Sequence, residues 1–340
     1  MNAVEKFFVL KGCAGLGNRL SSLAWAIGYC KNNGRTLFVD WTDGTFGKKG
    51  LNVFPRYFEL QGIPHASDIS QVLAEPTTTV FPALWGKHPD AAMWDIYEDD
   101  LVLLPKIQRL FLRLRTGNRW QLSNVWPARK RSADSLTVFS AIRSMRSGDW
   151  MPLMRSYSAD IAEDVVYACD YNPAYDPSLF LKHVSLRADV VSMLEQRIKA
   201  LAIDDRTLGI HVRQTDWKWG SGVDVLLGRL TKEVRQRQGN IFLATDSQEA
   251  LDKVRKVIPE VVVISKYLPE IEDKTMGIHQ LGYVRQDEAL AERIFLEGLI
   301  DMYALSKCGT LWHQKGSTFS EFAHVFAKPS QTIVDWGHRP

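Results

Sequence analysis

Several features that would assign a chain to a particular class are scarce or missing here. The 340 residues include four cysteines and no CxxC pair, so neither a zinc-type spacing nor a dense disulfide framework is indicated. No stretch approaches the ~20 consecutive apolar residues that a membrane-spanning helix needs. The net charge of +3 does not require a nucleic-acid partner. We therefore expect reduced, buried thiols, no membrane span and no bound nucleic acid.

The usual signatures of metal and covalent catalysis are also missing. The sequence contains no HExxH, no nucleophile elbow and no P-loop, and no His, Asp and Glu cluster has the spacing of metal ligands. The acidic run Glu98-Asp99-Asp100 lacks the DxD form, and we interpret it as a solvated turn. The apolar run at residues 7–10 is too short for the core of a signal peptide. We expect a cytoplasmic protein that holds no metal.

What the sequence does contain is an alternation of strand and helix patterns. Its length and its 45% hydrophobic and 24% charged residues suit a soluble protein of two domains. The first 41 residues predict a strand at 7–10, a glycine-rich turn at 12–17, a helix at 20–31 ended by Gly34, and a strand at 36–41. This order is that of a βαβ unit.

The rest of the chain divides into a poorly patterned middle and a regular end. Residues 60–190 are interpreted as loops and helices that complete the first domain, with helical patches at 106–115 and 185–201. Beyond residue 207, strand patterns occur at 208–213, 240–246, 261–265, 309–313 and 331–336. Helix patterns lie between them, at 223–237, 248–257, 287–307 and 318–327. Such alternation predicts an α/β fold with a parallel sheet covered on both faces.

Two Rossmann-like domains facing a cleft would give the glycosyltransferase B-type architecture, with domains at residues 1–190 and 191–340. Ligands of such sheets bind outside the carboxyl ends of the strands. The polar residues at those ends in the second domain are His211, Arg213, Asp216, Asp246, Ser247, Gly316, Ser317, Thr318 and Ser320. We expect these residues to converge on one rim, although other enzymes share this architecture and it does not settle function.

Two features of that rim suggest a ligand with a diphosphate. Arg213 ends a strand, and its planar fork of donors suits phosphates, unless it is a surface residue paired with Asp216 or Asp246. The run Ser317-Thr318-Phe319-Ser320 opens a helix, where backbone N–H groups attract anions, although an ordinary N-cap explains one of these hydroxyls.

Asp301 lies in an apolar helical run, where a carboxylate is costly unless it is paired. It can accept the N1–H and 2-amino groups of guanine, or it can pair with Lys307. The glycine-rich turn at 12–19, which contains Gly15 and Asn18, is either a loop near the ligand or a tight turn that supports helix packing.

Four segments together resemble a known family. The motifs GIHVRQTD, FLATDS, LIDMYALSKC and GSTFSEF occur in the order and approximate spacing found in α-1,6-fucosyltransferases. The N-terminal GLGNRLSSLAWAIGYCKNNGRTLFVDW is also similar, particularly to rhizobial nodulation fucosyltransferases of the NodZ type. The resemblance covers residues 6–60 and 205–336.

The resemblance implies a B-type fold, GDP-fucose as donor substrate, a glycan acceptor, inversion at the anomeric carbon and no metal or other cofactor. It implies an acceptor-binding first domain and a donor-binding second domain. The donor site would comprise His211, Arg213, Asp246, Asp301, Ser317, Thr318, Phe319, Ser320, Gly15 and Asn18. Arg213 would be catalytic. For the base, sequence position favours Asp216, which lies three residues beyond Arg213; Asp224, at the start of the next predicted helix, is the second candidate and has helix capping as its other role.

Departures from the family pattern leave other functions open. Gln214 replaces a second arginine that many members have, and Ser247 replaces an acid that some have. The alternatives are a transferase that uses another nucleotide sugar such as a UDP-sugar, an inactive sugar-binding relative, and a basic nucleic-acid-binding protein. The last rests on a basic stretch at residues 106–131, which a solvated helix face also explains.

Overall fold

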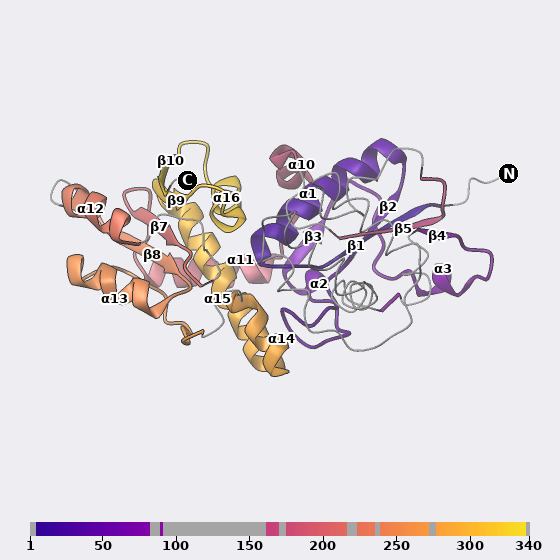
Figure 1. Cartoon of the computed structure of the whole chain (residues 1–340). Helices are drawn as coiled ribbons and strands as arrows, with labels where there is room; N and C mark the ends of the chain where they lie inside the picture. Colours follow the sequence, from indigo (N-terminus) through magenta and orange to yellow (C-terminus); the bar gives the residue numbers. More distant parts are fainter. Residues whose placement is uncertain are drawn as a thin grey trace, which may run out of the picture.

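The computed structural model describes residues 5–81, 89–90, 161–169, 175–215, 223–234, 239–271 and 277–337. Its strands form two four-stranded parallel sheets and one two-stranded antiparallel sheet. Figure 1 shows the two larger sheets in separate lobes, the first with strands from indigo to purple and one in pink, the second from salmon to yellow. Within these ranges, no helix is both long and apolar enough to cross a bilayer. The predicted domain boundary at residue 190 falls within a helix and stays a prediction.

The first lobe opens with the predicted βαβ unit. It consists of β1 (Phe7–Lys11), α1 (Leu16–Asn33) and β2 (Thr36–Asp40), with β1 and β2 parallel. Helix α1 begins four residues earlier than predicted, because Gly15 is its N-cap and the glycine-rich turn is part of the helix start. Gly34 ends the helix at a φ of 61°, the left-handed conformation that glycine adopts without strain.

The middle of the chain contains strands that the sequence pattern did not predict. The first sheet has the order β2-β1-β5-β4, and it includes β4 (Val80–Phe81) and β5 (Val165–Ala168). The prediction of loops and helices alone was therefore wrong here, because a fully buried strand of four residues has no alternation to reveal it. The predicted helix at 106–115 lies outside the described residues. The remaining elements are α2 (Phe54–Tyr57), β3 (Phe58–Leu60), α3 (Ser70–Ala74), α10 (Pro177–His183), β6 (Val184–Leu186) and α11 (Ala188–Ala200).

The second lobe follows the predicted alternation closely. Its sheet has the order β10-β9-β7-β8, formed by β7 (Leu208–Val212), β8 (Ile241–Thr245), β9 (Thr310–Gln314) and β10 (Thr332–Gly337). Its helices are α12 (Val223–Val234), α13 (Gln248–Val257), α14 (Leu281–Arg285), α15 (Glu288–Lys307) and α16 (Thr318–Val325), with a short 3₁₀ turn, η1 (Ile278–Gln280). The prediction of a strand at 261–265 was wrong. The backbone there pairs with β8 only around Val262, and the chain then continues toward the space between the lobes.

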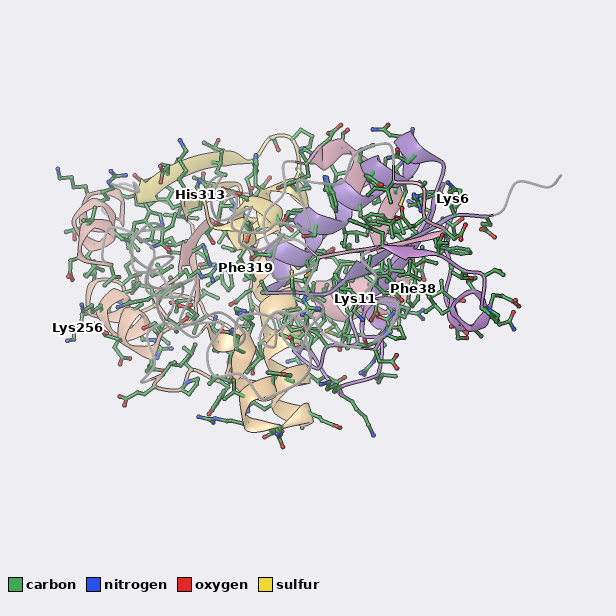
Figure 2. The ribbon with its side chains drawn as sticks, turned by 45° about the vertical axis from the view of Figure 1, so that its right-hand side comes forward. Lys6, Lys11, Phe38, Lys256, His313 and Phe319 are labelled. Carbon is green, nitrogen blue, oxygen red and sulfur yellow. The ribbon has the colours of Figure 1, made fainter. Side chains whose placement is uncertain are left out.

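The lobes meet where the first turns of α1 and α16 touch (Figure 1). Gly17 packs directly against the α16 backbone, so that a Cβ atom on it would lie 2.5 Å from the backbone nitrogen of Phe319. The hydroxyl of Thr318 donates to the side-chain oxygen of Asn18 at 2.9 Å. Figure 2 shows Phe319 at this junction, with Lys11 in the first lobe and Lys256 at the far end of the second. Glycine is therefore required at residue 17 by close backbone approach.

Replacing Gly17 by alanine should destabilise the protein, although alanine favours helix by roughly 1 kcal/mol. The added methyl group would force the two helix starts apart, and overpacking of this kind costs about 1–3 kcal/mol. Thermal unfolding of Gly17→Ala should show a lowered melting temperature. Gly228→Ala, on α12, is the matched control, because in the described part of the chain no atom beyond its own stretch of helix lies within 4 Å of the added methyl group. A Gly17→Ala protein that melts at or above the wild-type temperature would contradict this packing.

Candidate functional site

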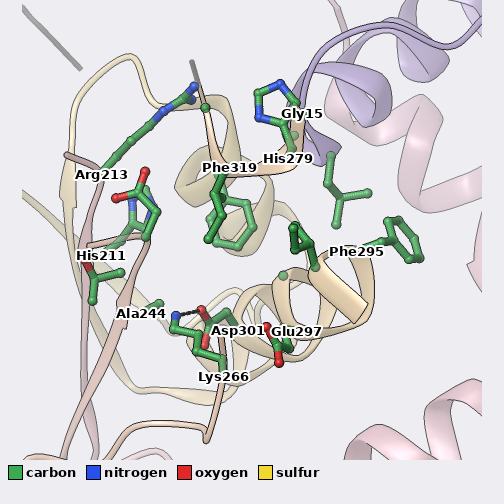
Figure 3. Close-up of a pocket in the computed structure, with 18 of the residues that line it drawn as sticks. Gly15, His211, Arg213, Ala244, Lys266, His279, Phe295, Glu297, Asp301 and Phe319 are labelled. Carbon is green, nitrogen blue, oxygen red and sulfur yellow. Dashed lines mark hydrogen bonds and ion pairs between the residues drawn. The ribbon is translucent and has the colours of Figure 1, made fainter. Parts of the chain in front are cut away.

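A pocket lies between the two lobes at the carboxyl ends of β7 and β8 (Figure 3). The first lobe contributes the start of α1 and Phe46, and the second contributes strand ends, the segment after residue 265, η1, and helices α15 and α16. The polar or charged side chains that line it are Asn18, His211, Arg213, Thr245, Asp246, Lys266, Tyr267, His279, Glu297, Asp301 and Thr318. The predicted convergence on one rim is therefore present, and it extends across both lobes.

His211 and Arg213 enter the pocket from the end of β7. The backbone N–H of Arg213 donates to the side chain of Gln314 at 2.7 Å, which ties this strand end to β9. His211 is buried, and its ring stacks on Phe319 with centroids 5.1 Å apart. Burial and then the charge of Arg213 hold the pKa of His211 well below its ordinary value, so the imidazole is neutral. Its Nδ1 atom is buried, and no described residue forms a hydrogen bond with it.

Asp246 fixes the backbone that follows Arg213. Its carboxylate accepts hydrogen bonds from the backbone N–H of Gln214 at 2.8 Å and from the hydroxyl of Thr215 at 2.6 Å. These contacts hold the loop after β7 against the end of β8. The side chain of Gln214, in contrast, reaches toward Glu249 at 3.4 Å.

The starts of α1 and α16 form one wall of the pocket. Gly15 caps α1 without a side-chain bond, and the first turn of α1 contains no acidic residue. Ser317 caps α16, also without a side-chain bond, and its buried hydroxyl has no hydrogen-bond partner within the described ranges. Two helix N-termini thus direct backbone N–H groups and the positive ends of their dipoles to the same region, which favours an anion there.

A buried ion pair places Phe46 on the first-lobe side of the pocket. Arg19, in the first turn of α1, donates to both carboxylate oxygens of Asp43, at 3.0 and 2.6 Å. Its guanidinium lies 4.5 Å from the ring centroid of Phe46. Phe46 in turn packs on Phe295 of α15, with centroids 4.7 Å apart. The charge of Arg19 is therefore compensated within the first lobe, and its role is to hold the loop that carries Phe46.

The floor of the pocket holds a second buried ion pair, between Lys266 and Asp301 (Figure 3). Both side chains are 7% exposed, and Lys266 bonds to Oδ2 of Asp301. The other oxygen, Oδ1, is buried and has no hydrogen-bond partner among the residues that the structure describes. Burial raises the pKa of Asp301 to about 6, against the opposing effect of the Lys266 charge. The pairing of Asp301 with Lys307 considered from the sequence is wrong, because Lys307 pairs with Glu195 at 3.0 Å.

The structure brings most of the predicted site residues together but not all of them. Gly15, Asn18, His211, Arg213, Asp246, Asp301, Thr318 and Phe319 line the pocket. Ser317 and Ser320 are fully buried behind it, and the Ser320 hydroxyl donates to the carbonyl of Ser317 at 3.2 Å. Asp224 does not line it; its side chain is 78% exposed on α12 and lies 3.6 Å from Lys253. Asp216 lies outside the described residues.

Three pocket residues were not predicted from the sequence: Lys266, His279 and Glu297. Lys266 could have been predicted, because it directly follows a predicted strand and ligands bind at strand ends. His279 lies on η1 beside Gly15, with no such pattern around it. Glu297 accepts from the backbone N–H of Tyr267 at 3.0 Å and pairs with Arg293 at 2.7 Å. Among the residues the structure describes, no three His, Cys, Asp or Glu side chains lie close enough to hold a metal ion.

Comparisons with known proteins support the predicted resemblance. No protein-family model matches the chain. It is 22% identical to Nodulation protein Z of Bradyrhizobium diazoefficiens, over 95% of this chain and 80% of that protein. The structure of NodZ α-1,6-fucosyltransferase soaked with GDP-fucose superposes with a TM-score of 0.57 at 19% identity, covering 95% of this chain and 93% of that one. POFUT1 in complex with GDP superposes with a TM-score of 0.50 at 10% identity, covering 98% and 99%.

These likenesses confirm two predictions, the α/β fold of glycosyltransferase B type and the resemblance to NodZ-type proteins. They leave the roles of individual residues to the geometry of this pocket. The chain therefore has the glycosyltransferase B-type fold and is similar, over nearly its whole length, to NodZ-type α-1,6-fucosyltransferases.

Proposed function

We propose that this protein is a fucosyltransferase that moves fucose from GDP-fucose to a hydroxyl group of a glycan, with inversion and without a metal. The observation that carries the proposal is the pocket between the lobes. It combines a strand-end guanidinium, two helix N-termini and a buried carboxylate with an open oxygen. Relatives with the same fold have been solved with GDP-fucose and with GDP, which supports the same donor here.

The diphosphate is the group that leaves, so its developing negative charge must be stabilised. Arg213 and the starts of α1 and α16 supply fixed positive charge and N–H donors on one side of the pocket. Asp246 keeps Arg213 in place through the loop that follows it. These groups would perform the neutralisation that a divalent cation performs in other glycosyltransferases.

The base of the nucleotide is proposed to meet Asp301. Guanine carries N1–H and a 2-amino group side by side, and a carboxylate accepts from both. Uracil offers one N–H between two carbonyl groups, so a UDP-sugar would bring a carbonyl oxygen against the open carboxylate oxygen. The neutral ring of His211, stacked on Phe319, lies between Arg213 and Asp301 in Figure 3 and can face the nucleoside.

The base that accepts the proton of the acceptor is proposed to be Asp216. It follows Arg213 by three residues in the sequence, between the residues of β7 and those of α12. Asp246 already accepts two strong hydrogen bonds from this loop, which suits a positioning role better. Asp224, the other candidate, points to Lys253 from an exposed position. The first lobe is proposed to bind the acceptor.

A transfer assay tests the function. With GDP-fucose and a panel of glycans, the wild-type protein should form fucosylated product, and it should do so in EDTA. Arg213→Ala should remain folded but lose transfer, because removing one such charge-stabilising donor costs on the order of 3–4 kcal/mol of barrier. Arg206→Ala, whose guanidinium is 80% exposed beside Asp204, is the matched control and should transfer normally. Near-normal turnover in Arg213→Ala, or a strict need for Mg²⁺ or Mn²⁺, would contradict the mechanism.

The affinity for GDP should fall on acidification. Only ionised Asp301 accepts both guanine donors, and its pKa of about 6 means that it becomes protonated as the pH drops through that value. Calorimetry from pH 7.5 to 5 should show wild-type affinity falling up to about tenfold per pH unit below the pKa. Asp301→Asn should bind GDP more weakly at neutral pH and lack this dependence, while still accepting a bond from Lys266. The terminal phosphate of GDP titrates in the same range and affects both proteins equally, so the contribution of Asp301 is the difference between their pH curves. Parallel curves for the two proteins would show that Asp301 does not bind the nucleotide.

The proposed base has its own test. Under saturating GDP-fucose, Asp216→Ala should reduce transfer by about 10²–10⁴-fold with GDP affinity unchanged, because a general base acts only on the acceptor. Asp224→Ala should transfer normally, since its side chain is exposed away from the pocket. If Asp216→Ala transfers normally as well, the base is another group and this assignment is wrong.

A further inference from the structure

Lys266 is a buried cation in the pocket that the mechanism above does not use. It follows the extended segment that pairs with β8 at Val262, and its side chain is 7% exposed. Its ammonium group donates a hydrogen bond to Oδ2 of Asp301. An ammonium group has three N–H donors, so this bond leaves others to direct at a ligand.

The ion pair presents three groups in a defined order. Oδ1 of Asp301 is a buried acceptor with no hydrogen-bond partner in the described part of the chain. Oδ2 is the middle group; it accepts from Lys266 and has a second lone pair available. Lys266 is a donor on the Oδ2 side. The pocket floor therefore presents two hydrogen-bond acceptors followed by a donor. A ligand that pairs with all three groups must present two donors followed by an acceptor.

Of the four common bases, guanine alone has this edge. Its 2-amino group and N1–H are donors, and O6 beside them is an acceptor. Adenine places its amino group against Lys266 and an unprotonated nitrogen against Oδ2. Uracil places a carbonyl oxygen against Oδ1, and cytosine mismatches at all three groups. A buried polar group that meets a like partner loses its hydrogen bond, so each mismatch is costly.

We propose that Lys266 donates a hydrogen bond to O6 of guanine and, with Asp301, selects the base of the nucleotide. The proposal rests on the proposed GDP-dependent function and adds a specificity residue to it. In Figure 3, Lys266 and Asp301 lie together at the side of the pocket away from the guanidinium of Arg213. This separation suits a nucleoside diphosphate whose base lies on the floor and whose phosphates lie at the helix starts.

The test measures how the protein distinguishes GDP from its analogues. The full chain is titrated with GDP, with 6-thio-GDP, in which sulfur is a weak acceptor at the O6 position, and with IDP, which lacks the 2-amino group. The wild-type protein should prefer GDP over each analogue by about tenfold, the usual size for one charge-assisted hydrogen bond. Lys266→Met should bind GDP more weakly than the wild-type protein does. The variant should bind GDP and 6-thio-GDP with equal affinity, while it keeps the preference for GDP over IDP.

Controls separate recognition from folding. Lys253→Met removes a partly exposed lysine on α13 that pairs with Glu249, and it should leave all three affinities unchanged. Lys266→Gln retains a donor and should restore part of the preference for GDP over 6-thio-GDP. If Lys266→Met fails to fold, the neutral pair Lys266→Met with Asp301→Asn replaces it and should lose both preferences.

The outcomes distinguish this proposal from the function on which it rests. If the wild-type protein binds GDP and transfers fucose, but Lys266→Met keeps the wild-type ratio of GDP to 6-thio-GDP affinity, the role of Lys266 is overturned and the function stands. A wild-type protein that binds no GDP overturns both.

Discussion

The contact between the starts of α1 and α16 is the constraint on which the site depends. Gly17 lets two helix backbones approach more closely than any side chain would allow, and the bond from Thr318 to Asn18 fixes their register. The contact brings the positive ends of two helix dipoles together without an acidic residue in the first turn of α1. Phe46 packed on Phe295 helps to hold the lobes against this repulsion. A bound diphosphate would relieve it, which links the docking of the lobes to the ligand.

The pocket changes in character from one end to the other. Arg213 and the helix starts make one side cationic, the stacked pair of His211 and Phe319 is neutral, and the floor holds the compensated pair of Lys266 and Asp301. A nucleoside diphosphate changes in the same order, from charged phosphates through the sugar to a hydrogen-bonding base. Burial lowers the pKa of His211, so its ring is neutral, and burial raises the pKa of Asp301 to about 6.

The sequence predicted the parts of the fold that follow periodic patterns. The four strands of the second sheet and most helices of that lobe were predictable from periodicity. His211, Arg213 and Asp246 were predictable with them, because strand ends in a parallel sheet share one edge. β5 was not, because a buried strand of four residues carries no alternation. The pairing of Asp301 with Lys266 joins segments 35 residues apart, and no local pattern encodes such a contact. Ser317 and Ser320 show the opposite limit: their position at a helix start was predicted, but not that both side chains turn inward.

The most direct measurement is a crystal structure of the full chain with GDP. The account predicts that the diphosphate lies against the starts of α1 and α16 beside Arg213, in a single conformation that spans both lobes. It predicts the guanine edge on the floor, with the 2-amino group at Oδ1 of Asp301, N1–H at Oδ2 and O6 at Lys266. A nucleotide bound with its phosphates at Lys266, or bound outside the space between the lobes, would contradict the account.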